Sequence, residues 1–421
     1  MTQPVDPNRA AAGTLAEQLP YFKRVVQSFA IPAYRSLWFN SLFGSMRLMV
    51  VFLARGWLVL ELTDSPFWVG FAPALRGFTQ IFLGAFSGVL LDRFDRRKLL
   101  VLAESFPTLI AFIIGLLLLF KRIELWHIMA ASAMEGVFMS IRWPAINTLV
   151  LETAGTRRIL NAAAGIMLGF TVGSIVATVS AGLIIARVGI GSAYLLAVAC
   201  GLIAIISAIR LRGNYQPKET EQEPVMRSLR RGIQYTWSVP GLRWIMALVF
   251  MMSFMGWSHV TMIPVMARDV LDVDAAGLGF LSAAGSAGAF VATLLIAGLK
   301  KDIHKTRMAL ILAVITAILL VSFAFSRWYL VSLGLKFVLW GTMFGFEATL
   351  AAVVLLITSE RMQGRVQGVY SLLFGFTWLG GILMGSIAEF YGAPMAIAIG
   401  GIALGTATLL IWRPLQRLDI R

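Results

Sequence analysis

The stretch Gly84–Leu100, GAFSGVLLDRFDRRKLL, joins two apolar segments through a short and strongly charged link. Small residues end the first segment, and the link that follows contains Asp92, Arg93, Asp95, Arg96, Arg97 and Lys98. Because the link is so short, both segments must end on the same side of a bilayer. Loops rich in Arg and Lys stay in the cytoplasm, so we expect this link to be cytoplasmic.

The link resembles a loop signature of the major facilitator superfamily, between that family's second and third spans. The matching residues are Gly88, Asp92, Arg93, Arg96 and Arg97, while Asp95 stands where the family usually has a second Gly. The resemblance implies a gating role. Asp92 would meet the start of the eleventh span around 364–366, where a helix N-terminus favours an anion, and the arginines would pair with carboxylates such as Glu152 or Glu360.

The composition indicates a polytopic membrane protein. Of 421 residues, 58% are hydrophobic and 14% are charged, whereas a soluble chain carries about 25% charged residues. The net charge is +15, but the basic residues lie in short loops, so we expect no nucleic-acid partner. The single Cys200 lies in an apolar segment and the three histidines are far apart, which predicts no disulfide, metal or cofactor. No pattern of catalytic residues predicts an enzyme.

A spanning helix needs about 20 mostly apolar residues, and twelve such segments follow one another. Their approximate limits are 36–62, 67–91, 99–120, 124–150, 162–186, 190–211, 242–268, 276–299, 307–326, 328–357, 366–389 and 392–412. We therefore expect an all-α membrane protein with twelve transmembrane helices. The predicted parts are a cytoplasmic tail (1–35), a six-helix bundle (36–211), a cytoplasmic linker (212–241), a second six-helix bundle (242–412) and a cytoplasmic tail (413–421).

The basic residues predict the orientation. Loops assigned to the cytoplasm hold most of the Arg and Lys, and the other side carries only Lys121, Arg122, Arg187, Arg268 and Arg327. Both termini are thus predicted to be cytoplasmic, and the chain to lie in the cytoplasmic (inner) membrane. Residues 1–30 lack the apolar core of a signal peptide and predict a tail with a short surface helix. Residues 225–239 are basic and amphipathic, and predict a helix on the inner membrane surface.

The two halves of the chain repeat one another. Gly88, Asp92 and Arg97 recur 210 residues later as Gly298, Asp302 and Arg307, again after the second span of a half. A weaker echo relates 169–171 to 375–377, since both read Gly-Phe-Thr. Two pseudo-symmetric six-helix bundles in parallel relation are the layout of this superfamily, with the substrate between them near the midplane.

Three longer runs are similar to the branch of the superfamily that includes the enterobactin exporter and macrolide exporters. They are GWLVLELT at 56–63, LDRFDRR at 91–97 and GRVQGVYS at 364–371. Two features of many drug–proton antiporters are different. Ala177-Thr178 replaces a Gly-Pro pair in the fifth span, and Ser132 replaces an Arg in the fourth. Both differences weaken the prediction of proton-driven export.

Several ionisable side chains lie inside the predicted spans, where each costs about 3 kcal/mol or more unless it faces a cavity or a partner. In the superfamily, the first, fourth, seventh and tenth spans line the central cavity. The resemblance therefore implies a substrate and proton pathway, to which the second span adds Arg76. The other members are Arg47, Arg55, Glu135, Arg142, His259, Lys336 and Glu347.

Structural roles for the same residues are the alternative. Arg47 could pair with Glu135 to hold two helices together, and His259 could be a hydrogen-bonded packing residue. Arg76, Arg142 and Lys336 could extend to the membrane interface. Glu135 and Arg142 are about two helical turns apart, and Lys336 and Glu347 about three, so each of these two pairs shares a helix face.

Glu135 is the predicted proton carrier. Burial favours the protonated form of a carboxylate, and a nearby Arg favours the ionised form. We expect Glu135 to bind a proton in one orientation of the cavity and to release it when Arg47 approaches. Five basic groups against two carboxylates predict a substrate with anionic or hydrogen-bond-accepting groups. Aromatic side chains add an apolar part, and they are Trp57, Phe254, Trp257, Trp340 and Phe344.

The predicted function is that of a secondary active transporter, a proton-coupled antiporter that exports a small amphiphilic, anionic compound by alternating access. The substrate would be siderophore-like or drug-like. An importer or a lysolipid flippase of the same fold is an alternative, and so is a membrane sensor or scaffold that has lost transport. The expected partners are the lipid bilayer, the small-molecule substrate and protons, and the chain is expected to be a monomer.

Overall fold

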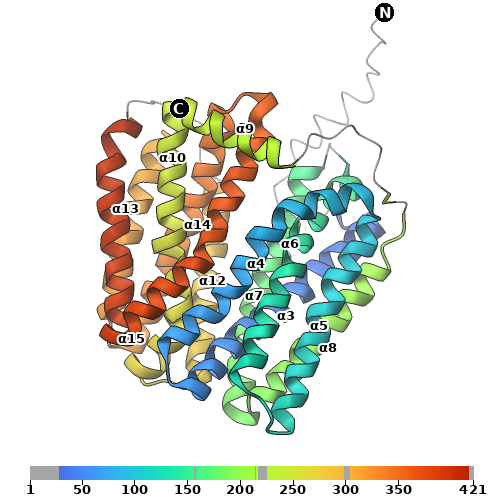
Figure 1. Ribbon diagram of the computed structural model, residues 1–421, viewed down its shortest axis with the longest axis vertical. Coiled ribbons are helices and arrows are strands. Elements are labelled where there is room, and N and C mark those ends of the chain that lie inside the picture. The colour runs from blue at the N-terminus through green and yellow to red at the C-terminus, as the bar shows by residue number, and fades with distance from the viewer. Residues whose placement is uncertain (1–27, 156–157, 214, 217–224, 298–303, 417–421) are drawn as a thin grey trace, which may run out of the picture.

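The computed structural model describes residues 28–155, 158–213, 215–216, 225–297 and 304–416, and their ordered elements are all helices (Figure 1). The long helices are α3 (Pro32–Thr63), α4 (Pro66–Arg93), α5 (Arg96–Leu119), α6 (Leu125–Ala154), α7 (Ile159–Val188), α8 (Ile190–Ile209), α10 (Pro240–Met251), α12 (Ala275–Ala297), α13 (Lys305–Phe325), α14 (Tyr329–Ile357) and α15 (Gln363–Gln416). Each begins and ends within about five residues of a predicted apolar segment, except α10 and α15. The prediction of an all-α protein is confirmed.

The range of α15 contains two helices that are separated by a break. At Gly392 the backbone is not helical (φ 81°, ψ 157°), and a positive φ of this kind suits Gly because it has no Cβ. Pro394 follows in the first turn of the second helix. A proline is tolerated there because the N–H that it lacks would have no partner within the helix. The break divides the 54 residues into the two segments predicted at 366–389 and 392–412.

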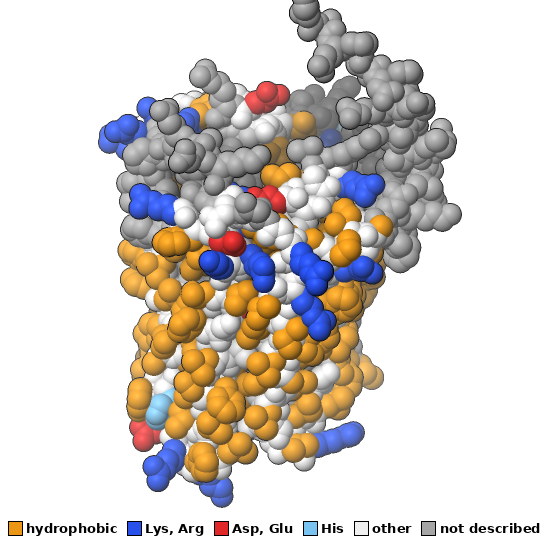
Figure 2. All heavy atoms as spheres, turned by 90° about the vertical axis from the view of Figure 1, so that its right-hand side faces the viewer, with side chains coloured by type: hydrophobic (Ala, Val, Ile, Leu, Met, Phe, Trp, Pro, Cys, Tyr) orange, Lys and Arg blue, Asp and Glu red, His pale blue; other side chains and the backbone are white. Residues whose placement is uncertain are grey.

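Among the described residues, nine helices are long and apolar enough to cross a membrane, with α15 counted once. Helices α4 and α6 have 28 and 30 residues, so each also has the length of a span. A space-filling view shows a broad apolar belt with Lys and Arg side chains gathered along one edge of it (Figure 2). This arrangement fits a chain whose apolar middle lies in lipid.

The segment that follows α10 is irregular. Between 240 and 270 the helix changes to a π-helix at η1 (Met252–Gly256) and to a 3₁₀-helix at η2 (Trp257–Met262). A short α11 (Ile263–Val265) and a second π-helix, η3 (Met266–Val270), complete it. Such changes inside a helix mark strained or functional positions, and His259 lies in this one. The preceding helix α9 (Val225–Ser238) confirms a helix at the predicted amphipathic segment.

Two groups of helices lie side by side in Figure 1, α3–α8 on the right and α10–α15 on the left. We call the end of the molecule at which α3 begins and α15 ends the terminal end, and the opposite one the far end. The two groups meet where α4 packs on α15 and α7 on α12. Glycines permit both contacts, since a Cβ on Gly385 would lie 2.9 Å from the Pro66 carbonyl oxygen and one on Gly279 would lie 2.5 Å from that of Thr178.

Candidate functional site

The first cluster of buried charges joins α3, α5 and α6. Arg47 Nη2 lies 3.2 Å from Glu104 Oε2, and Arg142 Nε lies 2.7 Å from Glu104 Oε1. The side chains of Arg47, Glu104 and Arg142 are 2%, 0% and 1% exposed, respectively. Gly44 on α3 makes room for them, because a Cβ there would lie 2.7 Å from Glu104 Oε1. We call these three residues the Glu104 triad, which has two arginines for one carboxylate.

The second cluster lies one layer closer to the far end. Arg55 Nη2 is 2.6 Å from Glu135 Oε1, and both side chains are buried. Arg76 on α4 is also buried, and its guanidinium stacks over the ring of Trp378 on α15 at 4.5 Å from the centroid. This Glu135 cluster again has two arginines for one carboxylate, and Arg76 connects it to the other group of helices.

The suggested pairing of Arg47 with Glu135 is wrong. Helices α3 and α6 run in opposite directions, so a charge on one can pair with a charge on the other only where both lie at the same level along the helix axes. Arg55 lies eight residues beyond Arg47, or about 12 Å along the helix, and Glu135 lies seven residues before Arg142, or about 10 Å. Arg55 therefore meets Glu135 in the layer closer to the far end, while Arg47 and Arg142 share the layer closer to the terminal end with Glu104. The guanidinium of Arg142 does not extend to the interface.

Glu104 was missed by the sequence analysis. It lies on α5, the third span, outside the spans that the family resemblance places around a cavity. A signal was nevertheless present, because Glu104 is the one charged residue in the predicted span 99–120. A lone carboxylate in so apolar a segment requires a buried cation, and two surplus arginines were available.

Several guanidinium nitrogens of these clusters have no hydrogen-bond partner among the described residues. They are Arg47 Nε, Arg55 Nε, Arg76 Nε, Arg142 Nη1 and Arg142 Nη2. An unpaired buried donor is costly, and guanidinium groups match anions with two acceptor atoms well. The two clusters together are therefore a buried region able to attract an anion.

In the other group of helices, Lys336 on α14 is buried against His259. Lys336 Nζ lies 2.7 Å from His259 Nε2, and His259 Nδ1 lies 2.6 Å from the Gly256 carbonyl oxygen. Because a carbonyl only accepts, Nδ1 carries the ring proton and Nε2 accepts from the lysine. Both side chains are fully buried. Lys336 Nζ also lies 5.2 Å from the ring centroid of Trp340.

Glu347, on the same helix as Lys336, makes separate contacts. Its carboxylate accepts hydrogen bonds from the Tyr370 hydroxyl and, at 3.3 Å, from Trp257 Nε1. Trp257 packs edge-on against Trp340 and Phe344, with ring centroids 5.6 Å and 5.4 Å away. The aromatic rings thus contact both Glu347 and Lys336. Of the five aromatic residues predicted at the site, three form this cluster.

The charged link before α5 is held within its own group of helices. Asp95 caps α5 by accepting from the backbone N–H of Arg97 and Lys98, which gives the Asp at the family's Gly position a structural reason. Arg96 pairs with Glu152 on α6. Arg97 differs from expectation, since it donates to the Ile209 carbonyl at the end of α8, at 2.5 Å, and no ion pair joins it to a carboxylate among the described residues.

The rest of the predicted gating set is only partly described. The side chains of Gly88 and Asp92 lie outside the described residues, as do Gly298 and Asp302 of the repeat. Arg93 is exposed near the end of α4, and Arg307 is exposed near the start of α13. The contact expected between Asp92 and 364–366 thus stays a prediction.

Polar contacts join the two groups of helices at the far end. Arg268 Nη2 lies 2.5 Å from Asp64 Oδ1, and Arg268 Nη1 donates to the Leu60 carbonyl at 3.3 Å. Glu389 on α15 accepts from the Ser65 hydroxyl at 2.8 Å and from the Phe67 N–H at 3.0 Å. The second contact places a carboxylate at the start of α4, where a helix N-terminus favours an anion.

Comparisons with known proteins agree on one family. The model of the family described as transmembrane secretion effector matches residues 25–419. The enterobactin exporter EntS of Escherichia coli O1:K1 / APEC is 26% identical over 402 residues, which cover 92% of this chain and 93% of the exporter. The same exporter of Escherichia coli O81 (strain ED1a) is 26% identical over 403 residues, with the same coverage.

Solved structures show the same fold. The nucleoside transporter NupG superposes with a TM-score of 0.73 at 15% identity, covering 92% of this chain and 100% of its own. A bacterial homolog of the human lysosomal transporter Spinster, in an inward-facing conformation, superposes with a TM-score of 0.72 at 11% identity, covering 92% and 98%. At these identities the likeness concerns the fold alone.

Proposed function

The chain belongs to the transmembrane secretion effector family of the major facilitator superfamily and is a multi-pass membrane transporter, and we propose that it exports a small amphiphilic, anionic compound in exchange for protons. The proposed location is the cytoplasmic membrane, with both termini and the terminal end of the molecule in the cytoplasm. The exporters that are 26% identical over 92% of the chain support this direction of transport.

The surplus of buried positive charge carries the proposal. The Glu104 triad and the Glu135 cluster hold four arginines and two carboxylates. Each uncompensated charge is costly in a medium of low dielectric, so a structural role alone would favour balanced pairs. A transported anion that accepts from the free guanidinium N–H groups would supply the missing negative charge.

The apolar part of the substrate would meet the aromatic cluster of Trp257, Trp340 and Phe344. Ring faces and edges bind flat apolar groups well, and Glu347 beside them accepts hydrogen bonds from Trp257 and Tyr370. A compound with an anionic part and an aromatic or lipophilic part would thus have complementary groups on both sides of the molecule.

Proton coupling is proposed at Glu135. Arg55 replaces Arg47 as its partner in the mechanism, since Arg55 makes the ion pair. In an exchanger, the substrate and the proton occupy the protein alternately. The substrate binds beside the Arg55–Glu135 pair while Glu135 is ionised. In the opposite orientation, after the substrate has left, Arg55 moves away and Glu135 takes up a proton, because a buried carboxylate without a cation favours the protonated form. Glu135 releases the proton when Arg55 returns, so protons and substrate move in opposite directions.

Alternating access is proposed to rock two six-helix bundles, 36–211 and 242–412, around these clusters. Polar contacts and close glycine packing join the two groups of helices at the far end, so we infer a conformation closed on that side. The charged link with Asp92, Arg93, Arg96 and Arg97, and its repeat with Asp302 and Arg307, would gate the terminal end.

The test is flux in vesicles that contain the purified full-length chain and an imposed pH gradient. Siderophores, macrolides, organic anions and lysolipids form the substrate panel, with enterobactin included because of the similar exporters. Proton-driven movement of an organic anion is expected. Absence of flux for the whole panel would favour a sensor or scaffold, and a clear preference for lipophilic cations would contradict the anion site.

The variant Glu135→Gln separates coupling from binding. It should abolish pH-driven flux while the substrate still binds, which tryptophan fluorescence or calorimetry can measure. The matched control is Asp272→Asn, which changes an exposed carboxylate in the turn before α12, and its flux should equal that of the unmodified chain. Undiminished proton-coupled flux in Glu135→Gln would remove Glu135 from the mechanism.

A further inference from the structure

A groove opens on the outer side of the second group of helices, between α13 and the last turns of α15. It encloses about 410 Å³ and is lined by Ile311, Val314, Ile315, Leu409, Trp412 and Arg413. All but the last of these are apolar. The groove lies away from the buried charges described above, and neither the transport proposal nor its direction depends on it.

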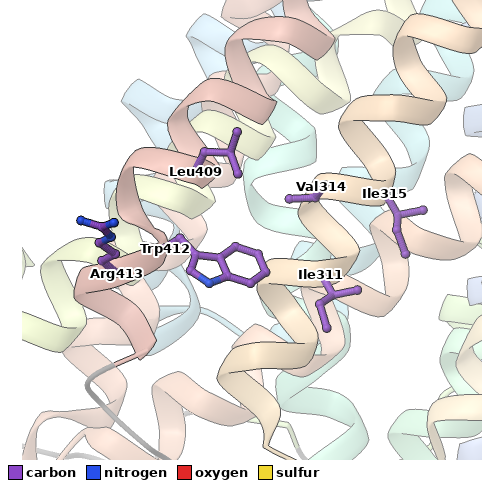
Figure 3. A pocket seen from close by; sticks show the side chains of 6 residues that line it. All are labelled: Ile311, Val314, Ile315, Leu409, Trp412 and Arg413. Carbon is purple, nitrogen blue, oxygen red and sulfur yellow. The ribbon is translucent and has the colours of Figure 1, made fainter.

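The groove opens toward lipid. Ile311 is 41% exposed and Leu409 is 64% exposed, and both lie in helices that qualify as membrane spans. Trp412 reaches from α15 toward α13 and forms the floor between them (Figure 3). In a bilayer, exposed apolar side chains of this kind contact acyl chains, and an indole near the end of a span lies at the level of the head groups.

The polar end of the groove is basic on both helices. Arg413 follows Leu409 by four residues toward the terminal end, and Arg307 precedes Ile311 by four residues toward the same end. Residues four apart lie on one helix face, and α13 and α15 pack against each other. Arg413 therefore lines the groove, and the exposed Arg307 lies one turn beyond Ile311 at the end where a lipid would place its head group.

We propose that this groove binds one anionic phospholipid, with an acyl chain along Ile311, Val314 and Leu409 and the phosphate between Arg307 and Arg413. The apolar floor accounts for the chain, and the paired arginines account for the choice of head group. Basic pockets between membrane helices bind anionic head groups for the same electrostatic reason. A zwitterionic lipid would fill the apolar part but gain less from the arginines.

The test measures quenching of Trp412 by lipids with brominated acyl chains. The full-length chain is reconstituted in vesicles that contain brominated phosphatidylglycerol or brominated phosphatidylcholine, in a range of mole fractions. The chain has 12 tryptophans, so the difference from Trp412→Phe isolates the signal of the groove. Half-maximal quenching of that signal should occur at a lower mole fraction of phosphatidylglycerol than of phosphatidylcholine.

Two arginine variants test the head-group site. Arg307→Gln and Arg413→Gln should each lower the preference for phosphatidylglycerol about fivefold and leave the quenching by phosphatidylcholine unchanged. The matched control is Arg210→Gln, which removes an exposed arginine at the same end of the molecule, at the end of α8. It should retain the full preference.

A second variant tests the apolar part. Val314→Phe fills the groove from α13 and should weaken quenching by both lipids, while the size-exclusion profile in detergent confirms the fold. Equal quenching by the two lipids in the unmodified chain would overturn the proposal. So would an unchanged preference in both arginine variants, because the attraction would then come from the general basic surface of the protein.

Discussion

At the scale of single residues, the buried charges divide into groups with different purposes. Glu104 neutralises two arginines from two other helices at once, which is a bracing role as well as an electrostatic one. Arg76 has no carboxylate within ion-pair distance among the described residues and lies on an indole ring instead. Lys336 contacts a neutral imidazole. The contacts of Glu104 stabilise the fold, whereas Arg76 and Lys336 remain without a carboxylate partner among the described residues and can attract an anion.

Removal of the Glu104 charge should therefore destabilise the chain. Glu104→Gln keeps the shape but leaves Arg47 and Arg142 without a counter-ion, and breaking a buried ion pair from one side costs about 3–5 kcal/mol. Thermal unfolding in detergent measures the loss. Glu360→Gln at the surface should change the unfolding free energy by less than about 0.5 kcal/mol. Equal stability of the two variants would show that Glu104 does not brace the helices.

Lys336→Met should have the opposite effect on stability. Among the described residues no ion pair joins Lys336 to a carboxylate, and its amino group contacts His259 Nε2 at 2.7 Å. A buried charge without a counter-ion is costly, so an apolar side chain of similar length should leave the unfolding temperature equal or raise it. Proton-driven flux should nevertheless fall if the proposed pathway includes this lysine.

The pair of measurements decides the role of Lys336. A variant that is as stable as the unmodified chain but transports poorly assigns the lysine to transport. A large loss of stability would instead make Lys336 a structural residue. Lys336→Arg is the control that keeps the positive charge at this depth, and its flux should exceed that of Lys336→Met.

At the scale of helices, close contacts depend on residues without side chains. Helix α7 meets α12 where Gly182 and Gly279 face each other, and α4 meets α15 near Gly70 and Gly385. At these positions the neighbour of an added Cβ is backbone, which cannot turn away. Small residues let helices approach closely in membranes. The far end closes on such contacts.

Gly279→Leu should thus prevent closure at the far end. A Cβ at this position would lie 2.5 Å from the Thr178 carbonyl oxygen and 3.0 Å from Gly182 Cα. Flux in vesicles should be lost, while substrate still binds to the purified protein. Gly334→Leu is the control, because nothing lies within 4 Å of a Cβ there. Normal flux in Gly279→Leu would show that α7 and α12 need not approach.

The sequence predicted the helices better than it predicted their contacts. Apart from α10 and α15, runs of apolar residues located the long helices to within about five residues, since length and hydropathy suffice for a span. The division predicted between 366–389 and 392–412 coincides with the break at Gly392 inside α15. The partners of Arg47 and Glu135 depend on the relative depth of antiparallel helices and on Glu104 from a third one. Hydropathy contains no such information.

The π and 3₁₀ turns around His259 could not be predicted from the sequence either. Residues 242–268 read as one uniform span, but Gly256 and Pro264 lie at the changes of helix type. His259 gains its hydrogen bond to the Gly256 carbonyl three residues earlier, a spacing that the 3₁₀ geometry favours. The sequence predicted the residue but not the local distortion that orients it.

At the scale of the whole molecule, the two groups of helices are joined at the far end by contacts that are individually weak. Asp64 is 82% exposed and Arg268 is 30% exposed, and an exposed ion pair contributes up to about 1 kcal/mol. Weak contacts suit a transporter, because a conformation that must open repeatedly cannot be held by strong ones. The balance between conformations should then respond to single charges.

Asp64→Asn combined with Glu389→Gln should shift the protein toward a conformation open at the far end. The two changes remove the partner of Arg268 and the carboxylate that accepts from Ser65 and Phe67. Because each of the two contacts contributes up to about 1 kcal/mol, the ratio of open to closed conformations should rise by up to about thirtyfold. High salt should raise the same ratio in the unmodified chain, and so reduce its difference from the variant, since salt screens exposed ion pairs.

Spin labels at the far end measure this ratio. Cys200→Ala removes the single native cysteine, and Arg122→Cys with Arg327→Cys places labels on exposed loops of the two groups. The double variant should gain a population with longer distances between the labels. Asp269→Asn is the matched control, because Asp269 contacts Arg268 from the same group of helices, at 2.5 Å. If this control lengthened the distances as much, the contacts across the two groups would not be what holds the far end closed.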